Sequence, residues 1–255
     1  MIPGAQPTVY YVNSADGWQA IDGAVIEERT VCLYVNGQEL ASFLCSPVDL
    51  DALALGFLRT EGVIGGLGDV ALLERAHQDA CVDVWLHGEF RQPGRRIRTS
   101  GCGNGVTFDD LSQRAFHIPL GKTVTAQQVI GRYLELRAAE TLYPITRGVH
   151  ASALCTPDSL RFIAEDVGRH NTVDKLWGKA MLAGAETAGS LLVTTGRISS
   201  EMLGKAAKMQ IPLVISRTSP TSRTVELARA WNITIVGYVR PTSMRVYTIP
   251  ERVRS

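Results

Sequence analysis

The sequence predicts a two-part protein, with an α+β first half and an α/β second half whose mostly parallel sheet has helices on both faces. Residues 31–87 contain two predicted strand pairs and one amphipathic helix, whereas residues 190–239 alternate strand, helix, strand, helix and strand. Strands of the second series are short and nearly all apolar, as expected where both faces of a sheet are covered. Such alternation gives parallel strands with right-handed crossovers.

Length and composition are those of an ordinary globular protein. Of the 255 residues, 45% are hydrophobic and 20% are charged, and the formal net charge is +1. This charge argues against a generally basic nucleic-acid-binding protein. No apolar run approaches the roughly 20 residues that span a bilayer, and the N-terminus lacks the features of a signal peptide. We therefore expect a cytoplasmic protein with no nucleic-acid partner and no membrane partner.

The chain divides into three parts in this interpretation. Residues 1–26 are polar and Gly-rich and predict an extended or loosely packed N-terminal arm. Residues 27–106 form the predicted α+β domain, and residues 107–255 form the predicted α/β domain. The Arg- and Gly-rich segment 91–105 is expected to be a long mobile loop that connects the two domains.

Two strand pairs are predicted in the first domain. Residues 31–35 and 39–44 flank Asn36-Gly37, a dipeptide that favours the type I′ turn of a β-hairpin. A second pair is expected near residues 69–75 and 80–87.

The predicted helix of the first domain follows its hairpin. We expect Ser46 to be the N-cap, with Pro47 at the first helical position and Asp49 three residues after the cap. Gly62 can end this helix. Its apolar side chains form one stripe, made of Leu50, Leu53, Ala54, Phe57 and Leu58.

Helices and strands of the second domain are predicted from their caps and periodicity. Residues 125–128 form a capping-box pattern that opens a helix running to about Leu142. Residues 151–156 and 160–164 read as a hairpin. The next helix has one apolar face, made of Val173, Leu176, Trp177, Ala180 and Met181. The alternating series then comprises strands 190–195, 211–216 and 233–239 and helices 199–209 and 221–231.

The carboxyl ends of these strands indicate a binding site, because ligands of open α/β sheets bind there. The loops concerned are 194–200, 216–221 and 238–243, joined by 165–171 if strand 160–164 runs in the same direction. Each loop carries one arginine, in chain order Arg169, Arg197, Arg217 and Arg240. Guanidinium groups and helix N-termini bind phosphates well, so we predict an anionic, nucleotide-like ligand.

The alternative is that these polar residues have only local roles. Ser199, Ser200 and Thr221 can be helix caps, and the arginines can be solvated ends. His170 stands beside Arg169 at a predicted helix start. Either it has a role in the binding site, or it only forms a structural hydrogen bond.

The five cysteines, an odd number without regular spacing, are not a disulfide framework and fit a reducing compartment. They are Cys32, Cys45, Cys81, Cys102 and Cys155. Four lie in apolar, strand-like segments, where cysteine packs as a small hydrophobic side chain. Cys102 instead lies between glycines and follows a run of arginines, which favours the reactive thiolate. An exposed thiol without function is the alternative.

Together these segments resemble the formate dehydrogenase accessory sulfurtransferase family, FdhD/NarQ. The strongest match is residues 165–175, EDVGRHNTVDK, which is close to the family's EDVGRHNAVDK. Further matches follow the family's order from about residue 27 to the end and comprise residues 35–37, 55–64, 148–151, 236–240 and 246–248.

The resemblance implies a sulfur carrier. It would take sulfur from a cysteine desulfurase as a persulfide on Cys102 and pass it to Mo-bis(molybdopterin guanine dinucleotide) before that cofactor enters formate dehydrogenase. It also implies a cytidine-deaminase-like fold for the second domain, commonly a homodimer, and no structural metal. The family's cofactor-contacting stretch maps onto Tyr238, Val239, Arg240, Pro241, Thr242 and Ser243. We predict that Arg169, His170, Arg197 and Arg217 complete these contacts.

The sequence departs from the family pattern at three places. The family loop usually reads CGxCG, but here Gly105 replaces the second cysteine. One thiolate suffices to hold a persulfide, whereas a second could release the outer sulfur by closing a disulfide. Arg147 stands where the family often has glycine, and Thr30 where proline is common.

Two other classes of function are considered. A zinc hydrolase of the deaminase type needs His-x-Glu together with Pro-Cys-x-x-Cys, and this combination does not occur in the sequence. A non-catalytic molybdenum-cofactor-binding chaperone would share the anion site but would not use the thiol of Cys102.

Overall fold

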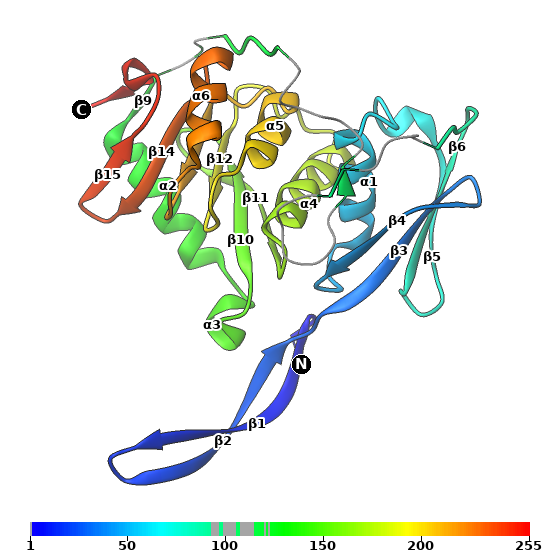
Figure 1. Cartoon of the computed structure of the whole chain (residues 1–255), viewed down its shortest axis with the longest axis horizontal. Helices are drawn as coiled ribbons and strands as arrows, with labels where there is room; N and C mark the ends of the chain where they lie inside the picture. Colours follow the sequence, from blue (N-terminus) through cyan, green and yellow to red (C-terminus); the bar gives the residue numbers. More distant parts are fainter. Residues whose placement is uncertain (1, 93–96, 99–105, 108–114, 120, 122) are drawn as a thin grey trace.

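The computed structural model describes residues 2–92, 97–98, 106–107, 115–119, 121 and 123–255. Figure 1 shows a β-hairpin that stands away from the body, a small sheet with one helix, and a larger sheet with helices on both faces. Among the described residues, no helix combines the length and apolar character needed to cross a membrane.

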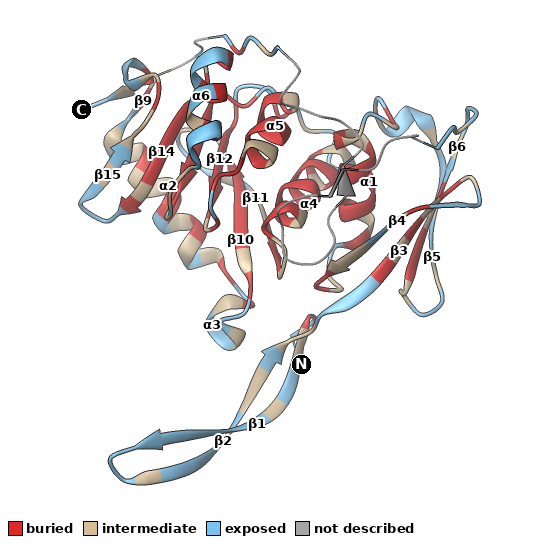
Figure 2. Cartoon of the chain, viewed as in Figure 1, coloured by how far each residue is buried: buried red, intermediate tan, exposed pale blue. Residues whose placement is uncertain are grey.

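The predicted N-terminal arm is a β-hairpin. Strand β1 (Ala5–Ser14) pairs antiparallel with strand β2 (Gly17–Ile26) along their whole length. Figure 2 shows that most of this hairpin is exposed.

The small sheet has the strand order β4-β3-β6-β5. Its strands are β3 (Arg29–Val35), β4 (Gln38–Cys45), β5 (Val70–Ala76) and β6 (Cys81–Leu86). Both predicted strand pairs are confirmed. Asn36 and Gly37 have φ angles of 47° and 77°, as a type I′ turn requires.

Helix α1 (Leu50–Thr60) covers one face of this sheet with the predicted apolar stripe. The predicted cap at Ser46 is wrong, because Ser46 is buried and bonded to the second half of the chain. Its N–H donates to Asp166 Oδ2 at 3.2 Å, and its hydroxyl accepts the N–H of Val167 at 3.2 Å. The helix therefore begins at Leu50, after Asp49, and Gly62 with φ 73° follows its end as predicted.

The interpretation of Cys32 and Cys81 as small hydrophobic side chains is wrong. These residues lie opposite each other in parallel strands β3 and β6, with Cα atoms 4.4 Å apart, and form a disulfide. Pairing of β3 with β6 depends on tertiary structure, so the sequence does not reveal it. Cys45 and Cys155 are buried and free, as expected of packed thiols.

The larger sheet has the order β11-β10-β12-β13-β14-β15 within the described residues. Its strands are β10 (His150–Cys155), β11 (Leu160–Asp166), β12 (Leu191–Thr194), β13 (Leu213–Ser216), β14 (Thr234–Arg240) and β15 (Ser243–Val246).

This sheet is mixed, which corrects the prediction of mostly parallel pairing. The β12–β13 and β13–β14 pairs are parallel, whereas β10–β11, β10–β12 and β14–β15 are antiparallel. Hairpins at both sides of the parallel core cause the difference. Two antiparallel steps separate β11 from β12, so β11 runs in the same direction as β12–β14.

Helices cover both faces of this sheet, as predicted. Helix α2 (Ala126–Ala139) packs on one face and begins with the predicted capping box at Thr125. Helices α4 (Arg169–Leu182), α5 (Ser200–Lys208) and α6 (Ser222–Trp231) cover the other face. The remaining elements are short: η1 (Leu67–Asp69), β7 (Ile97–Arg98), β8 (Val106–Thr107), β9 (Val124–Thr125), α3 (Tyr143–Thr146), η3 (Pro250–Arg252) and β16 (Val253–Arg254).

Helices α1 and α4 join the two halves of the chain. They cross at Gly56 and Gly178, where a Cβ atom on either residue would collide with the backbone of the other helix. The absence of side chains at these two positions lets the helices approach closely. The small sheet is therefore held against the helical layer that covers the larger sheet (Figure 1).

Candidate functional site: the carboxyl edge of the larger sheet

The four predicted loops lie at one edge of the larger sheet. We call loops 165–171, 194–200, 216–221 and 238–243 the carboxyl edge. Strands β11, β12, β13 and β14 run in the same direction, and their carboxyl ends lie there. Backbone hydrogen bonds connect neighbouring loops. Arg217 N–H donates to Thr194 O at 3.3 Å, and Tyr238 N–H donates to Thr218 O at 3.1 Å. The predicted grouping of these loops is confirmed.

The arginines of the carboxyl edge differ in exposure. Arg197, Arg217 and Arg240 are exposed, and Arg169 is buried. The Arg240 guanidinium donates to the carbonyl oxygens of Arg217 at 2.9 Å and Val239 at 2.8 Å. Arg240 is therefore fixed against the neighbouring loop that carries Arg217.

Tyr143 gathers two further arginines, Arg137 and Arg147, beside Arg217. The Arg137 and Arg147 guanidinium carbons lie 4.5 Å and 5.2 Å from the centre of its ring. Hydrogen bonding by Arg147 lowers the pKa of the Tyr143 phenol, and the Arg137 charge and a hydrogen bond from Arg217 act in the same direction. This cluster comes from α2 and α3 and was missed by the sequence interpretation, which considered only strand ends.

His150 and Arg169 lie together beneath the 194–200 loop. A Cβ atom at Gly196 would stand 3.1 Å from Arg169 Cβ and 3.4 Å from His150 Nδ1, so glycine permits this close approach. Burial lowers the pKa of His150, and the charge of Arg169 lowers it further. His150 is therefore a neutral imidazole at pH 7.

His170 lies between two side chains of the α5 N-terminus. Its Nε2 is 3.3 Å from Ser199 Oγ and 3.3 Å from Glu201 Oε2. Burial lowers the pKa of His170 to about 2, helped by the charges of Lys205 and Arg169. Burial also raises the pKa of Glu201 to about 7. A neutral imidazole thus faces a carboxyl group that can gain or lose a proton near neutral pH.

Two residues with hydroxyl side chains act as helix caps, which is the local role that the sequence offered as the alternative to ligand binding. Ser199 Oγ accepts the N–H of Met202 at 3.3 Å, and Thr221 Oγ1 accepts the N–H of Thr224 at 3.3 Å. Ser199 therefore both caps α5 and orders His170. Glu201 was missed by the sequence interpretation, since only the tertiary approach of α4 and α5 brings it to His170.

Glu165 and Asp166 bind neighbouring parts of the chain, and neither is a partner of His170 among the described contacts. The Glu165 carboxylate accepts the backbone N–H groups of Thr141, Leu142 and Tyr143 at 2.8, 2.9 and 3.0 Å. It fixes the turn that leads into α3. Asp166 forms an ion pair with Lys175 through Oδ2 and accepts the N–H of Gly168 through Oδ1, so it fixes the backbone of loop 165–171.

The cofactor stretch predicted from the family resemblance is a tight connection between β14 and β15. Tyr238 has a left-handed φ of 51°, and the Arg245 guanidinium carbon lies 4.3 Å from the centre of its ring. Val239 is buried, whereas the turn residues Pro241, Thr242 and Ser243 are exposed. The exposed turn lies beside Arg240 and can contact a ligand at the carboxyl edge.

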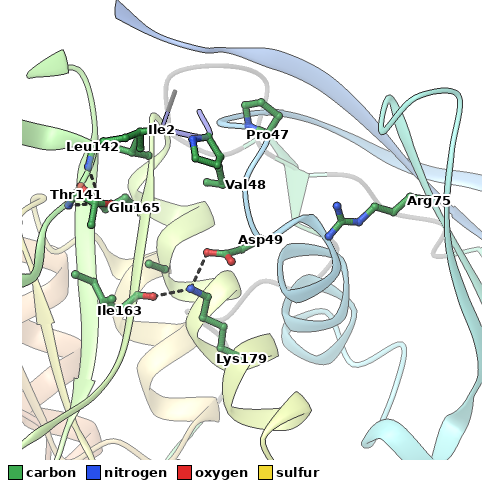
Figure 3. A pocket seen from close by; sticks show the side chains of 12 residues that line it. Ile2, Pro47, Val48, Asp49, Arg75, Thr141, Leu142, Ile163, Glu165 and Lys179 are labelled. Carbon is green, nitrogen blue, oxygen red and sulfur yellow. Dashed lines mark hydrogen bonds and ion pairs between the residues drawn. The ribbon is translucent and has the colours of Figure 1, made fainter. Parts of the chain in front are cut away.

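A separate cavity of about 420 Å³ lies between the two halves of the chain (Figure 3). Its charged side chains are already paired. Lys179 lies 2.7 Å from Asp49, and Arg75 contacts Asp51 at 2.7 Å. None of the four edge arginines lines this cavity. It is therefore distinct from the predicted anion site.

Cys102 lies outside the described residues, as does most of segment 91–105. Its reactivity therefore stays a prediction. Within the part of the chain that is described, no cluster of His, Cys, Asp and Glu could hold a metal ion.

The fold and the edge together define an α/β protein with an arginine-lined strand edge beside a buried His–Glu pair. The chain belongs to the FdhD/NarQ family, whose model matches residues 26–254. It is 34% identical over 242 residues to the sulfur carrier protein FdhD of Shouchella clausii (strain KSM-K16), covering 91% of each chain. It is 32% identical to the protein of that name from Bacillus subtilis (strain 168), covering 92% of each.

One solved structure is also similar. The crystal structure of a proposed formate dehydrogenase accessory protein from Desulfotalea psychrophila matches with a TM-score of 0.84 and 28% identity. The match covers 98% of this chain and 100% of the other. The family resemblance noted in the sequence is confirmed.

Proposed function

We propose that this chain is a sulfur carrier for the maturation of formate dehydrogenase. It takes sulfur from a cysteine desulfurase as a persulfide on Cys102 and transfers it to Mo-bis(molybdopterin guanine dinucleotide). The observation that carries the proposal is a family match over residues 26–254, with relatives named sulfur carrier proteins.

The state of the other cysteines supports the choice of Cys102. Cys32 and Cys81 are joined in a disulfide. Burial raises the pKa of Cys45 and of Cys155 to about 12, so neither forms a thiolate at neutral pH. Of the five cysteines in the sequence, Cys102 is the remaining candidate for a nucleophile.

The loading step is a thiol exchange without net oxidation. The Cys102 thiolate attacks the outer sulfur of the desulfurase persulfide. A new S–S bond forms to Cys102, the S–S bond of the donor breaks, and the donor cysteine leaves as a thiolate. The arginines of segment 91–98 favour the attacking thiolate.

The cargo would bind at the carboxyl edge. Arg197, Arg217 and Arg240 offer exposed guanidinium groups to its phosphates, and the Tyr238–Arg240 strand end leads into the exposed turn beside them. Arg169 and His170 stand behind this surface and order it. The same proposal includes a cytoplasmic location and a cytidine-deaminase-like ancestry of the α/β half.

The loading step is tested by incubating the protein with a cysteine desulfurase and cysteine and then measuring its mass. We expect a sulfur adduct on the wild type and on a Cys45→Ala control, and none on Cys102→Ala. An adduct that survives Cys102→Ala would refute the assignment. Complementation of a strain lacking its native accessory protein, with the same variants, tests the role in formate dehydrogenase maturation.

A non-catalytic cofactor chaperone is the second candidate. Gly105 in place of the family's second cysteine favours it, because a release route through a disulfide is lost. This candidate predicts that Cys102→Ala complements as well as the wild type.

A further inference from the structure

We propose that Glu201 is a positioning residue for the carboxyl edge, because it sets which ring nitrogen of His170 carries the proton. The imidazole then offers a ligand at this edge either a hydrogen-bond donor or a hydrogen-bond acceptor. The inference deepens the proposed function and rests on it for the presence of an anionic ligand at the edge. It follows from the contact between the two side chains, from their burial and from the charges around them.

The contact between Glu201 and His170 involves one nitrogen of the ring. Glu201 Oε2 lies 3.3 Å from Nε2, and Ser199 Oγ lies 3.3 Å from the same nitrogen. The other nitrogen, Nδ1, has no hydrogen-bond partner among the described residues. The His170 side chain keeps 11% of its surface exposed. Since Nε2 is occupied by the interior contacts, Nδ1 is the nitrogen that a ligand can reach.

The packing of α4 and α5 directs Glu201 toward the interior. The two helices contact each other on one face of the larger sheet (Figure 1). Glu201 lies in the first turn of α5, and its side chain is 15% exposed. Ser199 already caps this helix, because its Oγ accepts the N–H of Met202. The carboxyl group of Glu201 has no capping role and meets the imidazole of α4 instead.

One hydrogen atom lies between Glu201 Oε2 and His170 Nε2, and it couples the two groups. When the carboxyl group is ionised, the Nε2–H group donates to it and Nδ1 is left as an acceptor. When the carboxyl group is protonated, its O–H group donates to Nε2, so the ring proton is on Nδ1 and Nδ1 is a donor. The tautomer of His170 therefore follows the protonation of Glu201.

The change from the first state to the second takes up one proton. The proton adds to Nδ1, the Nε2–H bond breaks, and an O–H bond forms on Glu201 Oε2. The ring is neutral before and after this change. The buried carboxyl group can thus exchange its proton with solvent through the imidazole of His170.

The charges around Glu201 allow both states near neutral pH. Burial is the largest cause that raises the pKa of Glu201, and the carboxylates of Asp174 in α4 and Glu61 after α1 act in the same direction. The cations of Lys205 in α5 and Arg169 in α4 lower this pKa. The resulting pKa is about 7. The carboxyl group therefore gains or loses its proton near neutral pH.

The imidazole itself stays neutral over this range. Burial is the main cause that lowers the pKa of His170 to about 2. The neighbouring charges of Lys205, Arg169 and His150 act in the same direction. The two neutral tautomers are therefore the states between which the ring alternates.

An anionic ligand at the carboxyl edge favours the protonated state of Glu201. Its negative charge repels the Glu201 carboxylate, and its oxygen atoms can accept a hydrogen bond from Nδ1–H of His170 but not from a bare Nδ1. Because the coupling is reciprocal, binding of the anion takes up a proton when the pH is above about 7. The anion then binds more weakly as the pH rises.

The first test observes the tautomer of His170 in the full chain without a ligand. Nitrogen-15 magnetic resonance of histidine-labelled protein distinguishes protonated from unprotonated ring nitrogens, and His170→Gln assigns the signals among the five histidines. We expect Nδ1 and Nε2 of the wild type to exchange their protonation with a midpoint near pH 7. In Glu201→Gln the two signals should stay constant over that range. A purely structural role of Glu201 would not produce this difference.

Two outcomes of this experiment would overturn the proposal. One is a wild-type tautomer that stays constant between pH 5.5 and 8.5, a range of about one and a half units on either side of the Glu201 pKa. The other is protonation of both ring nitrogens at the lower pH, which would show that the imidazole titrates in place of the carboxyl group. Circular dichroism and thermal unfolding check that Glu201→Gln remains folded.

The second test counts the protons taken up when guanosine diphosphate binds, since the cargo of the proposed function contains this group. Titration calorimetry at pH 7.5 in buffers of different ionisation enthalpy gives the number. The terminal phosphate, which titrates near about pH 6, is already ionised there. A rise of about one unit in the Glu201 pKa on binding corresponds to about 0.5 proton per ligand and to about 4-fold weaker binding at pH 8.5 than at pH 7.

Matched variants assign this uptake to Glu201. Glu201→Gln should take up no proton and bind the ligand equally at pH 7 and 8.5. Glu226→Gln, at an exposed glutamate of α6, should behave like the wild type. Equal proton uptake by the wild type and Glu201→Gln would overturn the coupling. If the ligand does not bind to the wild type, the anion site of the proposed function is wrong, whereas the tautomer experiment still decides the role of Glu201.

Discussion

The Nζ atom of Lys175 lies 2.6 Å from Oδ2 of Asp166, and neither side chain has any exposed surface. Lys175 Nζ also donates to the carbonyl oxygens of Ser46 at 3.1 Å and Glu165 at 3.2 Å. Asp166 Oδ1 accepts the N–H of Gly168 at 2.7 Å. The pair therefore joins the two ends of segment 165–175 and ties it to the chain that precedes α1. The family motif in this segment is in large part a structural anchor.

Removal of the Lys175 cation should destabilise the protein strongly. Lys175→Met leaves the Asp166 carboxylate buried without its partner charge, so we expect a loss of about 3–5 kcal/mol in the free energy of unfolding. Urea denaturation at pH 7 measures it. Arg223→Ala is the control, because its ion pair with Glu226 is 55% and 62% exposed and should contribute about 1 kcal/mol or less. A similar small loss for both variants would contradict this account of the motif.

The crossing of α1 and α4 gives a second prediction. Gly56→Ala places a methyl group on the carbonyl oxygen of Asp174, so the helices must separate. We expect a loss of about 1–3 kcal/mol or more, as in other overpacked interiors. Gly131→Ala in α2 is the matched control, because nothing lies within 4 Å of its Cβ position. It should stabilise by about 0.5–1 kcal/mol, since alanine is the better helix former. Thermal unfolding of both variants measures these changes in stability. If Gly56→Ala is as stable as the wild type, the helices are not in close contact.

Local sequence signals predicted most of the helices and strands. Asn36-Gly37, the capping box at Thr125 and the apolar runs 190–195, 211–216 and 233–239 each fix their own element with neighbouring residues. Loops at the carboxyl edge followed from strand direction alone. The turn, the capping box and the apolar runs depend on contacts between residues that are close in sequence.

Features that depend on distant contacts were not predicted. Cys32 meets Cys81 only because β3 pairs with β6, and Ser46 is removed from its predicted cap by bonds to residues 166 and 167. Glu201 reaches His170 through the packing of α4 and α5. No periodicity or spacing encodes these approaches, so the sequence could not reveal them.

The His170–Glu201 pair should give two opposing pH effects on stability. The folded-state pKa of His170 is lowered to about 2. Between about pH 2 and 6.5 the imidazole therefore binds a proton only in the unfolded chain, so the stability of the folded state falls as the pH falls through that range. The folded-state pKa of Glu201 is raised to about 7, so the folded chain holds the proton and stability falls as the pH rises from 4.5 to 7. Between about pH 4.5 and 6.5 the two slopes, each at most about 1.4 kcal/mol per pH unit, should nearly cancel.

Single variants separate these slopes. Glu201→Gln removes the carboxyl group, so its stability should rise with pH between 4.5 and 6.5 relative to the wild type. His170→Gln removes the imidazole, so its stability should fall over the same interval. Urea denaturation at half-unit steps of pH measures both. Parallel curves for the wild type and the two variants would show that neither group has a shifted pKa in the folded chain.

Arg147 has a left-handed backbone, with φ 55°, at the position where the family often has glycine. This conformation costs a residue with a Cβ atom about 1 kcal/mol or more and costs glycine little. The side chain compensates in part, because its guanidinium carbon lies 5.2 Å from the centre of the Tyr143 ring. Arg147→Ala and Arg147→Gly both remove that contact, but only Arg147→Gly relieves the backbone. We therefore expect the glycine variant to be more stable than the alanine variant by about 1 kcal/mol in urea denaturation. Equal stabilities would mean that the backbone at residue 147 is not left-handed, and the family's preference for glycine would then need another cause.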